Sequence, residues 1–308
     1  MSKLIVSGFF SLLYLIFSAY HALNVEIAGD TEEYFSHFSE ITHTWFPFGL
    51  EFVVSILMLV SNALHGGFEL FIFANYILWL PLVIFLSKRI EDRPEFILIV
   101  LFLLSSYFFD NAAFLIRQYE AVILFIYFIY FGFNRVGFVF LVFSIGAHFY
   151  AFILLLMTSP VLFRILFSPV GRLLVSLLMV FTWLNIVDVG SIVIEMFDRQ
   201  WEVFGSVITR KISGMQAVFD EGGNANSSSV AFINYLIVIV ILIFGAPQNI
   251  TFWQRTAFVA ILVSSIMVSL FVDYPILANR AAFITYFFSI PSLILVVGNI
   301  WNRRIKFL

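Results

Sequence analysis

Arg117 and Arg280 are the two residues whose type and position first suggest chemistry, because each stands where a long apolar segment begins. A guanidinium offers a planar fork of donors that matches phosphate oxygens, and the N-terminus of a helix also attracts anions. Together the two arginines could hold a diphosphate group. A structural role is the alternative: Arg117 could pair with Asp110 or Glu120, and Arg280 could pair with Asp273 or anchor its segment at the membrane interface.

Asp30 and His148 are candidates for proton transfer. A carboxylate at the mouth of a membrane cavity could remove a proton from a hydroxyl group, and an imidazole can act as a base near neutral pH. The alternatives are a solvated acidic face for Asp30 and a packed side chain for His148, and the sequence does not rank the two residues. Three polar residues could support them: Tyr34 one helical turn after Asp30, Gln118 beside Arg117, and Glu51, whose charge in an apolar segment is costly unless it faces a polar cavity.

The composition determines what kind of protein positions these residues. Apolar residues make up 62% of the 308-residue chain and charged residues 11%, with a mean hydropathy of +1.04. A soluble domain has about 25% charged residues, and a disordered chain would be polar and poor in aromatic residues. The long apolar runs also differ from the alternating pattern of a β-barrel. The sequence therefore predicts an all-α, polytopic membrane protein.

Several site classes are excluded or unsupported. The chain has no cysteine, which excludes disulfides, thiolate metal sites and a catalytic thiol. It has no Walker loop, no dinucleotide fingerprint and no H-E-x-x-H motif, and its histidines show no metal-ligand spacing. We therefore expect no metal, no cofactor and no nucleic-acid partner.

The apolar segments that could each cross a bilayer need roughly 17–25 residues. They are 4–23, 68–87, 96–110, 119–133, 173–190, 230–246, 256–272 and 280–298. Two further segments are ambiguous. Segment 47–64 begins with Pro47 and Gly49, and segment 137–167 is long enough for two short helices that break near His148.

The distribution of basic residues favours ten crossings, in which 47–64 does not cross and 137–167 crosses twice. Both termini are then cytoplasmic, and eleven of the sixteen Lys and Arg residues lie inside, as the positive-inside rule requires. These eleven are Lys3, Lys88, Arg89, Arg93, Arg135, Arg164, Arg172, Arg255, Arg303, Arg304 and Lys306. We expect one integral membrane domain over residues 1–308, with larger outer loops at 24–67 and 191–229. The first loop should hold a surface helix with Tyr34, Phe35 and Phe38 on its apolar face.

Short motifs occur in an order that resembles one protein family. They are Asp30-x-x-x-Tyr34, Glu51 in an apolar stretch, Ile116-Arg117-Gln118, His148-Phe149-x-Ala151, and Arg280 followed by Tyr286-Phe287. This order is similar to that of the EpsG-like and Wzy-type polysaccharide (O-antigen) polymerases of bacterial inner membranes, over nearly the whole chain.

The resemblance implies a membrane glycosyltransferase that joins undecaprenyl-diphosphate-linked repeat units into O-antigen, capsule or exopolysaccharide outside the cytoplasmic membrane. Its fold would resemble C-type glycosyltransferases. Arg117 and Arg280 would bind the diphosphate, Asp30 or His148 would be the base, and the expected partners are the lipid-linked oligosaccharide and membrane lipid. A chain-length regulator protein could also act on the enzyme, although the sequence identifies none.

Two other functions fit the same residues. An O-antigen ligase, or a transferase that uses polyprenyl phosphate, would need the same cations and base. A lipid-linked sugar flippase or transporter is disfavoured, because the sequence shows one suspected broken helix and no matching inverted repeat.

Overall fold

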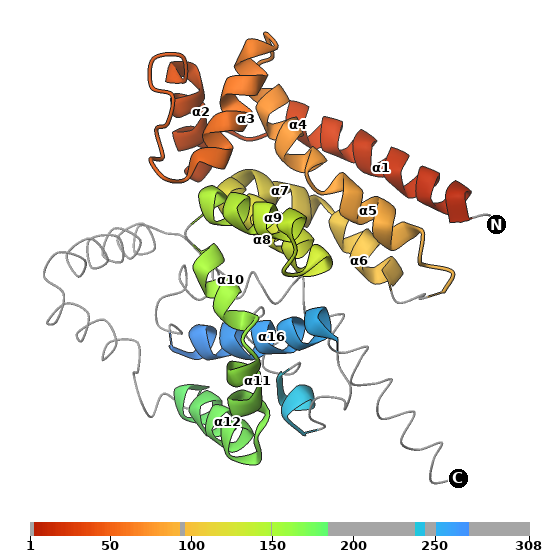
Figure 1. Ribbon diagram of the computed structural model, residues 1–308. Coiled ribbons are helices and arrows are strands. Elements are labelled where there is room, and N and C mark those ends of the chain that lie inside the picture. Colours follow the sequence, from red (N-terminus) through yellow and green to blue (C-terminus); the bar gives the residue numbers. More distant parts are fainter. Residues whose placement is uncertain (1–2, 93–95, 149, 184–237, 244–250, 271–308) are drawn as a thin grey trace, which may run out of the picture. The chain divides into compact units, whose positions relative to one another are not determined.

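The computed structural model describes residues 3–92, 96–148, 150–183, 238–243 and 251–270 (Figure 1). Every element in these residues is a helix, so the all-α prediction is confirmed for them. The chain divides into two compact units, residues 1–155 and 156–308. The helices are α1 (Lys3–Leu23), α2 (Asp30–Glu40), α3 (Phe52–Ala63), α4 (Phe68–Ile77), α5 (Leu80–Ser87), α6 (Phe96–Leu103), α7 (Ser106–Phe114), α8 (Ile116–Phe131), α9 (Arg135–Ala147), α10 (Ala151–Met157), α11 (Pro160–Phe167), α12 (Pro169–Trp183) and α16 (Phe252–Leu270).

Three described helical segments are long and apolar enough to cross a membrane: Lys3–Leu23, Phe68–Ser87, which comprises α4 and α5, and Phe252–Leu270. Two bent helix pairs raise the number to five if each pair forms one span. A multi-pass membrane protein is therefore supported. The total of ten crossings stays a prediction, because predicted spans 230–246 and 280–298 lie largely or wholly outside the described residues, as do Arg280 and the outer loop 191–229.

The predicted span 96–110 is not one straight helix. The structure divides it into α6 and α7, which meet at an angle of 58°. The side chain of Ser105 accepts a hydrogen bond from the backbone N–H of Phe108 and so caps the start of α7. Side-chain capping of this kind satisfies a free amide at a helix start and stabilises the new helix direction.

Segment 137–167 breaks where the sequence predicted, because α9 ends at Ala147 and α10 begins at Ala151. The second half differs from the prediction, since it divides again before Pro160. Pro160 has no N–H to continue a helix, and Ser159 caps the new helix by accepting from the backbone N–H of Leu162. In the other ambiguous segment, α3 has 12 residues. That corresponds to a length of about 18 Å, too short to cross a hydrocarbon core of about 30 Å. Helix α9 has 13 residues and is also shorter than this core, so the two crossings of 137–167 stay a prediction.

Aromatic side chains form the core of the first unit. Tyr14 of α1 donates a hydrogen bond to the carbonyl of Tyr76, and the Tyr76 hydroxyl donates to the carbonyl of Phe109, at 2.9 and 3.1 Å. Trp79 packs edge-on against Phe108. These buried rings join α1, α4 and α7, and their hydroxyl groups find backbone acceptors as buried phenols require.

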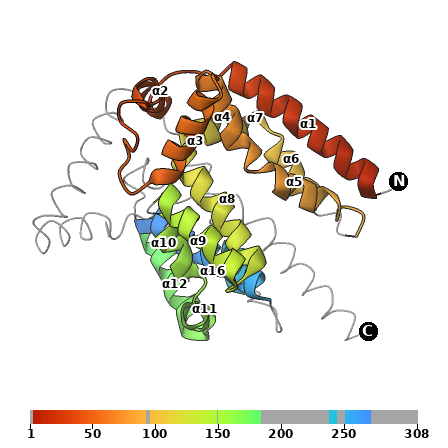
Figure 2. The same ribbon diagram turned by 45° about the horizontal axis from the view of Figure 1, so that its top comes forward.

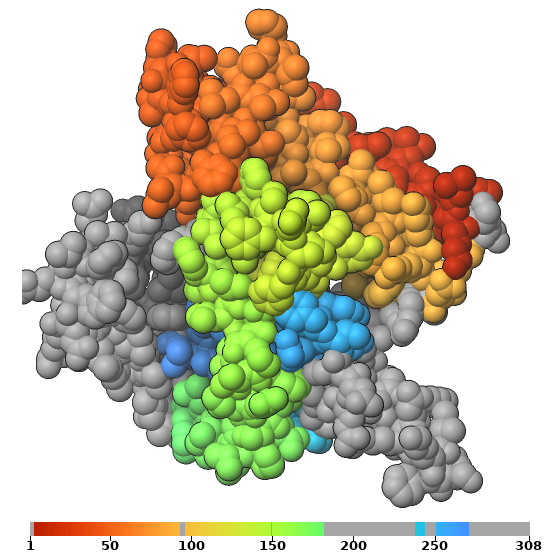
Figure 3. All heavy atoms as spheres, in the orientation of Figure 1, coloured from red at the N-terminus to blue at the C-terminus, as the bar shows by residue number. Residues whose placement is uncertain are grey.

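Helices α8 and α9 lie side by side in both ribbon views (Figures 1 and 2). The buried hydroxyl of Ser144 on α9 donates to the carbonyl of Ala121 on α8 at 2.7 Å. The opposite face of α9 is exposed and apolar, with Phe138, Val139 and Val142 on it, and α9 reaches the molecular surface (Figure 3). Contiguous apolar surface of this kind suits contact with lipid.

In the second unit, α11, α12 and α16 pack together. Phe167 packs edge-on against Phe258, and Arg172 donates to the carbonyl of Leu242 at 3.1 Å. None of the predicted site residues within the described chain lies in this unit.

Two ion pairs mark the ends of α1. Lys3 contacts Asp92 at 2.6 Å, and His21 at the other end contacts Asp110 at 3.3 Å. The predicted topology places Lys3 and Asp92 on the cytoplasmic side and Asp110 outside. Each contact joins two residues at the same end of α1, and the side of the membrane that each end faces stays a prediction.

The topology can be tested by cysteine labelling, since the chain has no native cysteine. We expect a membrane-impermeant maleimide added to intact cells to label Gly222→Cys, in the loop predicted to lie outside, and not Asp92→Cys. Both variants should label after the membrane is permeabilised. The reverse pattern in intact cells contradicts the ten-crossing arrangement.

Candidate active site

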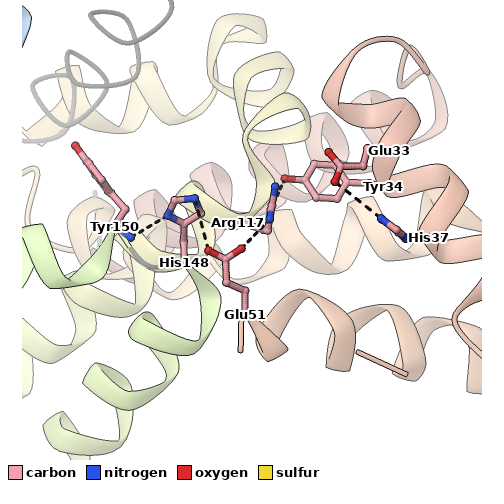
Figure 4. A network of polar contacts seen from close by, with 7 residues as sticks. All are labelled: Glu33, Tyr34, His37, Glu51, Arg117, His148 and Tyr150. Atoms are coloured by element: carbon pink, nitrogen blue, oxygen red, sulfur yellow. Dashed lines mark hydrogen bonds and ion pairs between the residues drawn. The ribbon is translucent and has the colours of Figure 1, made fainter. Parts of the chain in front are cut away.

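The Arg117 guanidinium is the centre of a polar cluster in the first unit (Figure 4). Its Nη1 donates to Oε2 of Glu51 at 2.7 Å, and its Nε donates to the hydroxyl of Tyr34 at 3.1 Å. The pair is half-buried, with 25% of the Arg117 side chain and 18% of the Glu51 side chain exposed. Residues from α2, from the start of α3 and from the start of α8 therefore meet at one point.

The ring of Phe48 is a further partner of this cation. The guanidinium carbon lies 4.6 Å from the centre of the Phe48 ring and 5.6 Å from that of Tyr34. Both distances are within the range of cation–π attraction. His37 packs edge-on against Phe48. The guanidinium is thus held by a carboxylate, a hydroxyl and aromatic faces.

The charge states of Tyr34 and Arg117 follow from their surroundings. Burial raises the pKa of the Tyr34 hydroxyl above its ordinary value; Arg117 opposes this shift and Asp30 adds to it. Burial lowers the pKa of Arg117, but Tyr34 and Glu51 raise it by more, so that it ends above its usual range. Tyr34 is therefore neutral and Arg117 is cationic at physiological pH.

His148 lies at the break between α9 and α10 and reaches the same carboxylate. Its Nε2 is 3.8 Å from Oε1 of Glu51, and its Nδ1 accepts a hydrogen bond from the backbone N–H of Tyr150 at 2.9 Å. A nitrogen that accepts a hydrogen bond carries no proton, so the neutral ring carries its proton on Nε2, toward Glu51. Glu51 consequently lies between Arg117 and His148, one carboxylate oxygen toward each.

Gly29 and Thr31 fix the position of the start of α2. Gly29, just before α2, has a φ of +58°, and an added Cβ would lie 2.7 Å from the Phe114 ring of α7. The hydroxyl of Thr31 donates to the carbonyl groups of Glu26 and Ala28 and accepts from the backbone N–H of Ala28. The start of α2 is therefore held close to α7, which directs Tyr34 toward Arg117.

Helix α2 forms where the surface helix was predicted, but its buried aromatic side chains contact protein. Tyr34 and Phe38 are buried, Tyr34 beside Arg117 and Phe38 against Phe68 and Phe71, whereas Phe35 is exposed. The two buried rings contact protein and not the membrane surface, because the aromatic residues of α4 and the Arg117 cation provide their partners.

Four of the seven predicted site residues come together: Tyr34, Glu51, Arg117 and His148. Asp30 begins α2, one turn from Tyr34, and its charge acts on the Tyr34 hydroxyl. The remaining two are Gln118, which is buried beside Arg117 with no hydrogen-bond partner for its Oε1, and Arg280, which lies outside the described residues.

The ion-pair partner of Arg117 is neither of the two residues that the sequence suggested. Asp110 contacts His21, and the carboxylate oxygens of Glu120 have no hydrogen-bond partner. The partner of Arg117 is Glu51, 66 positions earlier in the chain. A test for a structural ion pair must therefore exchange Arg117 with Glu51 and not with Asp110.

Two residues of the site had not been singled out as functional in the sequence. Phe48 carries no charge and is one of 41 phenylalanines, so no sequence signal distinguishes it. Glu120 is 1% exposed, and Arg117 and Glu51 are charged groups that act on it. Its signal was available, because a carboxylate inside an apolar segment is a functional candidate by default.

The described residues contain no group of three or more His, Asp or Glu side chains that could hold a metal ion. What the cluster offers instead is a cation with a directional fork, a carboxylate and an imidazole. A cation of this type binds phosphate oxygens, and a carboxylate next to an imidazole can accept and pass on a proton.

Comparison with known families assigns the chain. Residues 8–308 match the family described as the EpsG family. The chain belongs to the EpsG family. The resemblance seen in the short motifs is thereby confirmed, and the motif residues Tyr34, Glu51, Arg117 and His148 are the ones that the fold brings together.

No curated protein and no solved structure gives a significant match to the chain. Membership of the EpsG family indicates a membrane protein of polysaccharide biosynthesis with a glycosyltransferase-like role.

Proposed function

We propose that this protein is a polymerase that joins undecaprenyl-diphosphate-linked oligosaccharide repeat units on the outer side of the bacterial cytoplasmic membrane. The observation that carries the proposal is the Arg117 cluster, in which one cation is held in a fixed orientation beside a carboxylate and an imidazole. The family assignment supports polysaccharide biosynthesis as its setting. Both chain ends would be cytoplasmic.

Arg117 has the properties that a diphosphate site requires. Only part of the guanidinium fork is used by Tyr34 and Glu51, and a quarter of the side chain is exposed. A phosphate oxygen could therefore approach without removing both existing contacts. Arg280 would supply the second cation, and the polyprenyl chain would remain in the surrounding lipid.

In the proposed reaction, a hydroxyl group of the acceptor saccharide attacks the anomeric carbon of the donor saccharide. The new glycosidic bond forms as the bond from the anomeric carbon to the diphosphate oxygen breaks, and the electron pair leaves with undecaprenyl diphosphate. Arg117 stabilises the charge that develops on that oxygen. The hydroxyl proton passes to a base of the enzyme.

The hydrogen bond that His148 accepts helps to identify that base. Its Nδ1 accepts from the Tyr150 N–H, and its neutral ring holds a proton on Nε2. Glu51 is the proton acceptor that this geometry favours, with the protonated Nε2 of His148 3.8 Å from its Oε1. Asp30 is the other carboxylate candidate, because it stands one turn from Tyr34 at the start of α2.

The overall function is tested by the length of surface saccharide in a strain that lacks this protein. We expect single repeat units on the lipid acceptor, and long polymer after the wild-type gene is restored. Absence of any saccharide on the acceptor indicates a ligase instead. Accumulation of lipid-linked units on the cytoplasmic side indicates a flippase.

A further inference from the structure

Gly146 and Phe52 are in unusually close contact next to the proposed catalytic pair. Phe52 follows Glu51 and begins α3, and Gly146 lies two residues before His148 near the end of α9. A Cβ added to Gly146 would lie 2.2 Å from Cε1 and 2.4 Å from Cζ of the Phe52 ring. Real Cβ contacts are not that short, so only glycine lets the ring lie there.

The Phe52 ring is restrained on a second side. Phe143, one turn before Gly146 on α9, packs edge-on against it with ring centres 5.9 Å apart. The ring therefore lies against α9 at both positions and cannot turn away from a new Cβ without losing a packed contact. A side chain at position 146 would push α3 and α9 apart.

Glu51 and His148 lie next to this contact in the chain, and the distance between them depends on it. Glu51 directly precedes Phe52, and His148 stands at the C-terminal end of α9. Their side chains are 3.8 Å apart, which leaves the distance sensitive to a shift of either helix. The other carboxylate oxygen of Glu51 accepts from Arg117, which also donates to Tyr34.

We propose that Gly146 and Phe52 are positioning residues, whose close contact sets the position of the Glu51 carboxylate relative to His148 and so to the hydroxyl proton that Glu51 accepts. The proposal rests on the polymerase function argued above and deepens it. Proton transfer depends steeply on the distance between the groups, and a displacement of about 1 Å can cost about 10²-fold in rate.

The test compares Gly146→Ala with the double variant Gly146→Ala/Phe52→Leu, each purified and placed in liposomes with a lipid-linked repeat unit. We expect the turnover of Gly146→Ala to fall by about 10²-fold, with unchanged affinity for undecaprenyl diphosphate, because Tyr34 and Phe48 still hold Arg117. The smaller leucine makes room for the new methyl group. The turnover of the double variant should therefore be at least about tenfold higher than that of Gly146→Ala, and so about a tenth of the wild-type value or more.

Gly8→Ala is the matched control. Gly8 is also a helical glycine, and an added Cβ there meets nothing within 4 Å. The substitution changes helix propensity in the same direction, and we expect wild-type turnover. The amount of folded protein in detergent is measured for every variant.

The outcomes separate the inference from the function it rests on. Normal turnover of Gly146→Ala in a preparation whose wild type polymerises overturns the inference and leaves the polymerase proposal standing. A loss that Phe52→Leu does not restore, or a loss of donor affinity and of folded protein in parallel, assigns Gly146 a purely structural role and also overturns it. A folded wild-type protein that forms no polymer from the repeat unit overturns both.

Discussion

Arg117→Lys is expected to reduce polymer formation by about 10²–10³-fold, the range for loss of one oriented donor to a developing oxyanion. Lysine keeps the positive charge but loses the planar fork with which Arg117 contacts Tyr34 and Glu51 at once. A single ammonium group cannot keep both contacts and also hold a phosphate oxygen in line. The measurement is the length and amount of saccharide made from a lipid-linked repeat unit, with the affinity for undecaprenyl diphosphate measured in parallel.

Arg89→Lys is the matched control, because Arg89 is an exposed arginine that also lies over an aromatic ring, that of Phe85. It is far along the chain from the cluster, on the loop predicted to be cytoplasmic. We expect normal polymer from this variant. A loss of activity there would show that arginine-to-lysine changes disturb the protein in general.

The charge exchange Arg117→Glu/Glu51→Arg distinguishes a binding cation from a structural ion pair. A structural pair survives when the two charges change places, whereas a diphosphate site does not, because the cation is moved to α3. We expect a folded protein without polymer. Long polymer from the exchanged protein would mean that Arg117 only joins two helices, and the assignment of the diphosphate site would then be wrong.

The sequence could predict the residues of this site better than their partners. Glu51 was identified by the cost of a charge in an apolar segment, Arg117 by its place at the start of such a segment, and His148 by its place at a helix break. The carboxylate that pairs with Arg117 could not be predicted from its distance along the chain. Asp110, seven positions before Arg117, was one of the two expected partners, but it lies on α7 and contacts His21 of α1. Glu51 reaches Arg117 because α3, which begins directly after Glu51, packs against α8.

The two helix breaks also differ in whether the sequence could predict them. The break near His148 was visible in the sequence because Gly146-Ala147-His148 interrupts an apolar run that is too long for one helix. The bend at Ser105 was not, since serine is tolerated within a membrane helix and becomes a cap only when the chain changes direction. Phe48 had no signal at all, because its role depends on the cation beside it.

Glu51→Gln is expected to lower the rate of polymerisation by about 10²–10⁴-fold, the usual contribution of a general base. Glutamine has nearly the same shape and keeps an oxygen that can accept from Arg117, but it cannot take up a proton. Because Tyr34 and Phe48 still hold the guanidinium, we expect the affinity for undecaprenyl diphosphate to remain. A reduced turnover with intact donor binding is therefore the expected signature, measured on the same lipid-linked repeat unit.

His148→Ala and Asp30→Asn complete this test, with Glu32→Gln as the control on the exposed face of α2. If Glu51 is the base and His148 orients it, His148→Ala should also lower turnover, and Asp30→Asn should have the smaller effect. If Asp30 is the base, its variant alone abolishes polymer and Glu51→Gln remains active. Normal polymer from Glu51→Gln, His148→Ala and Asp30→Asn together would exclude these three residues as the base. The proton would then have to leave through another group, and the contact between Glu51 and Arg117 would be a structural one.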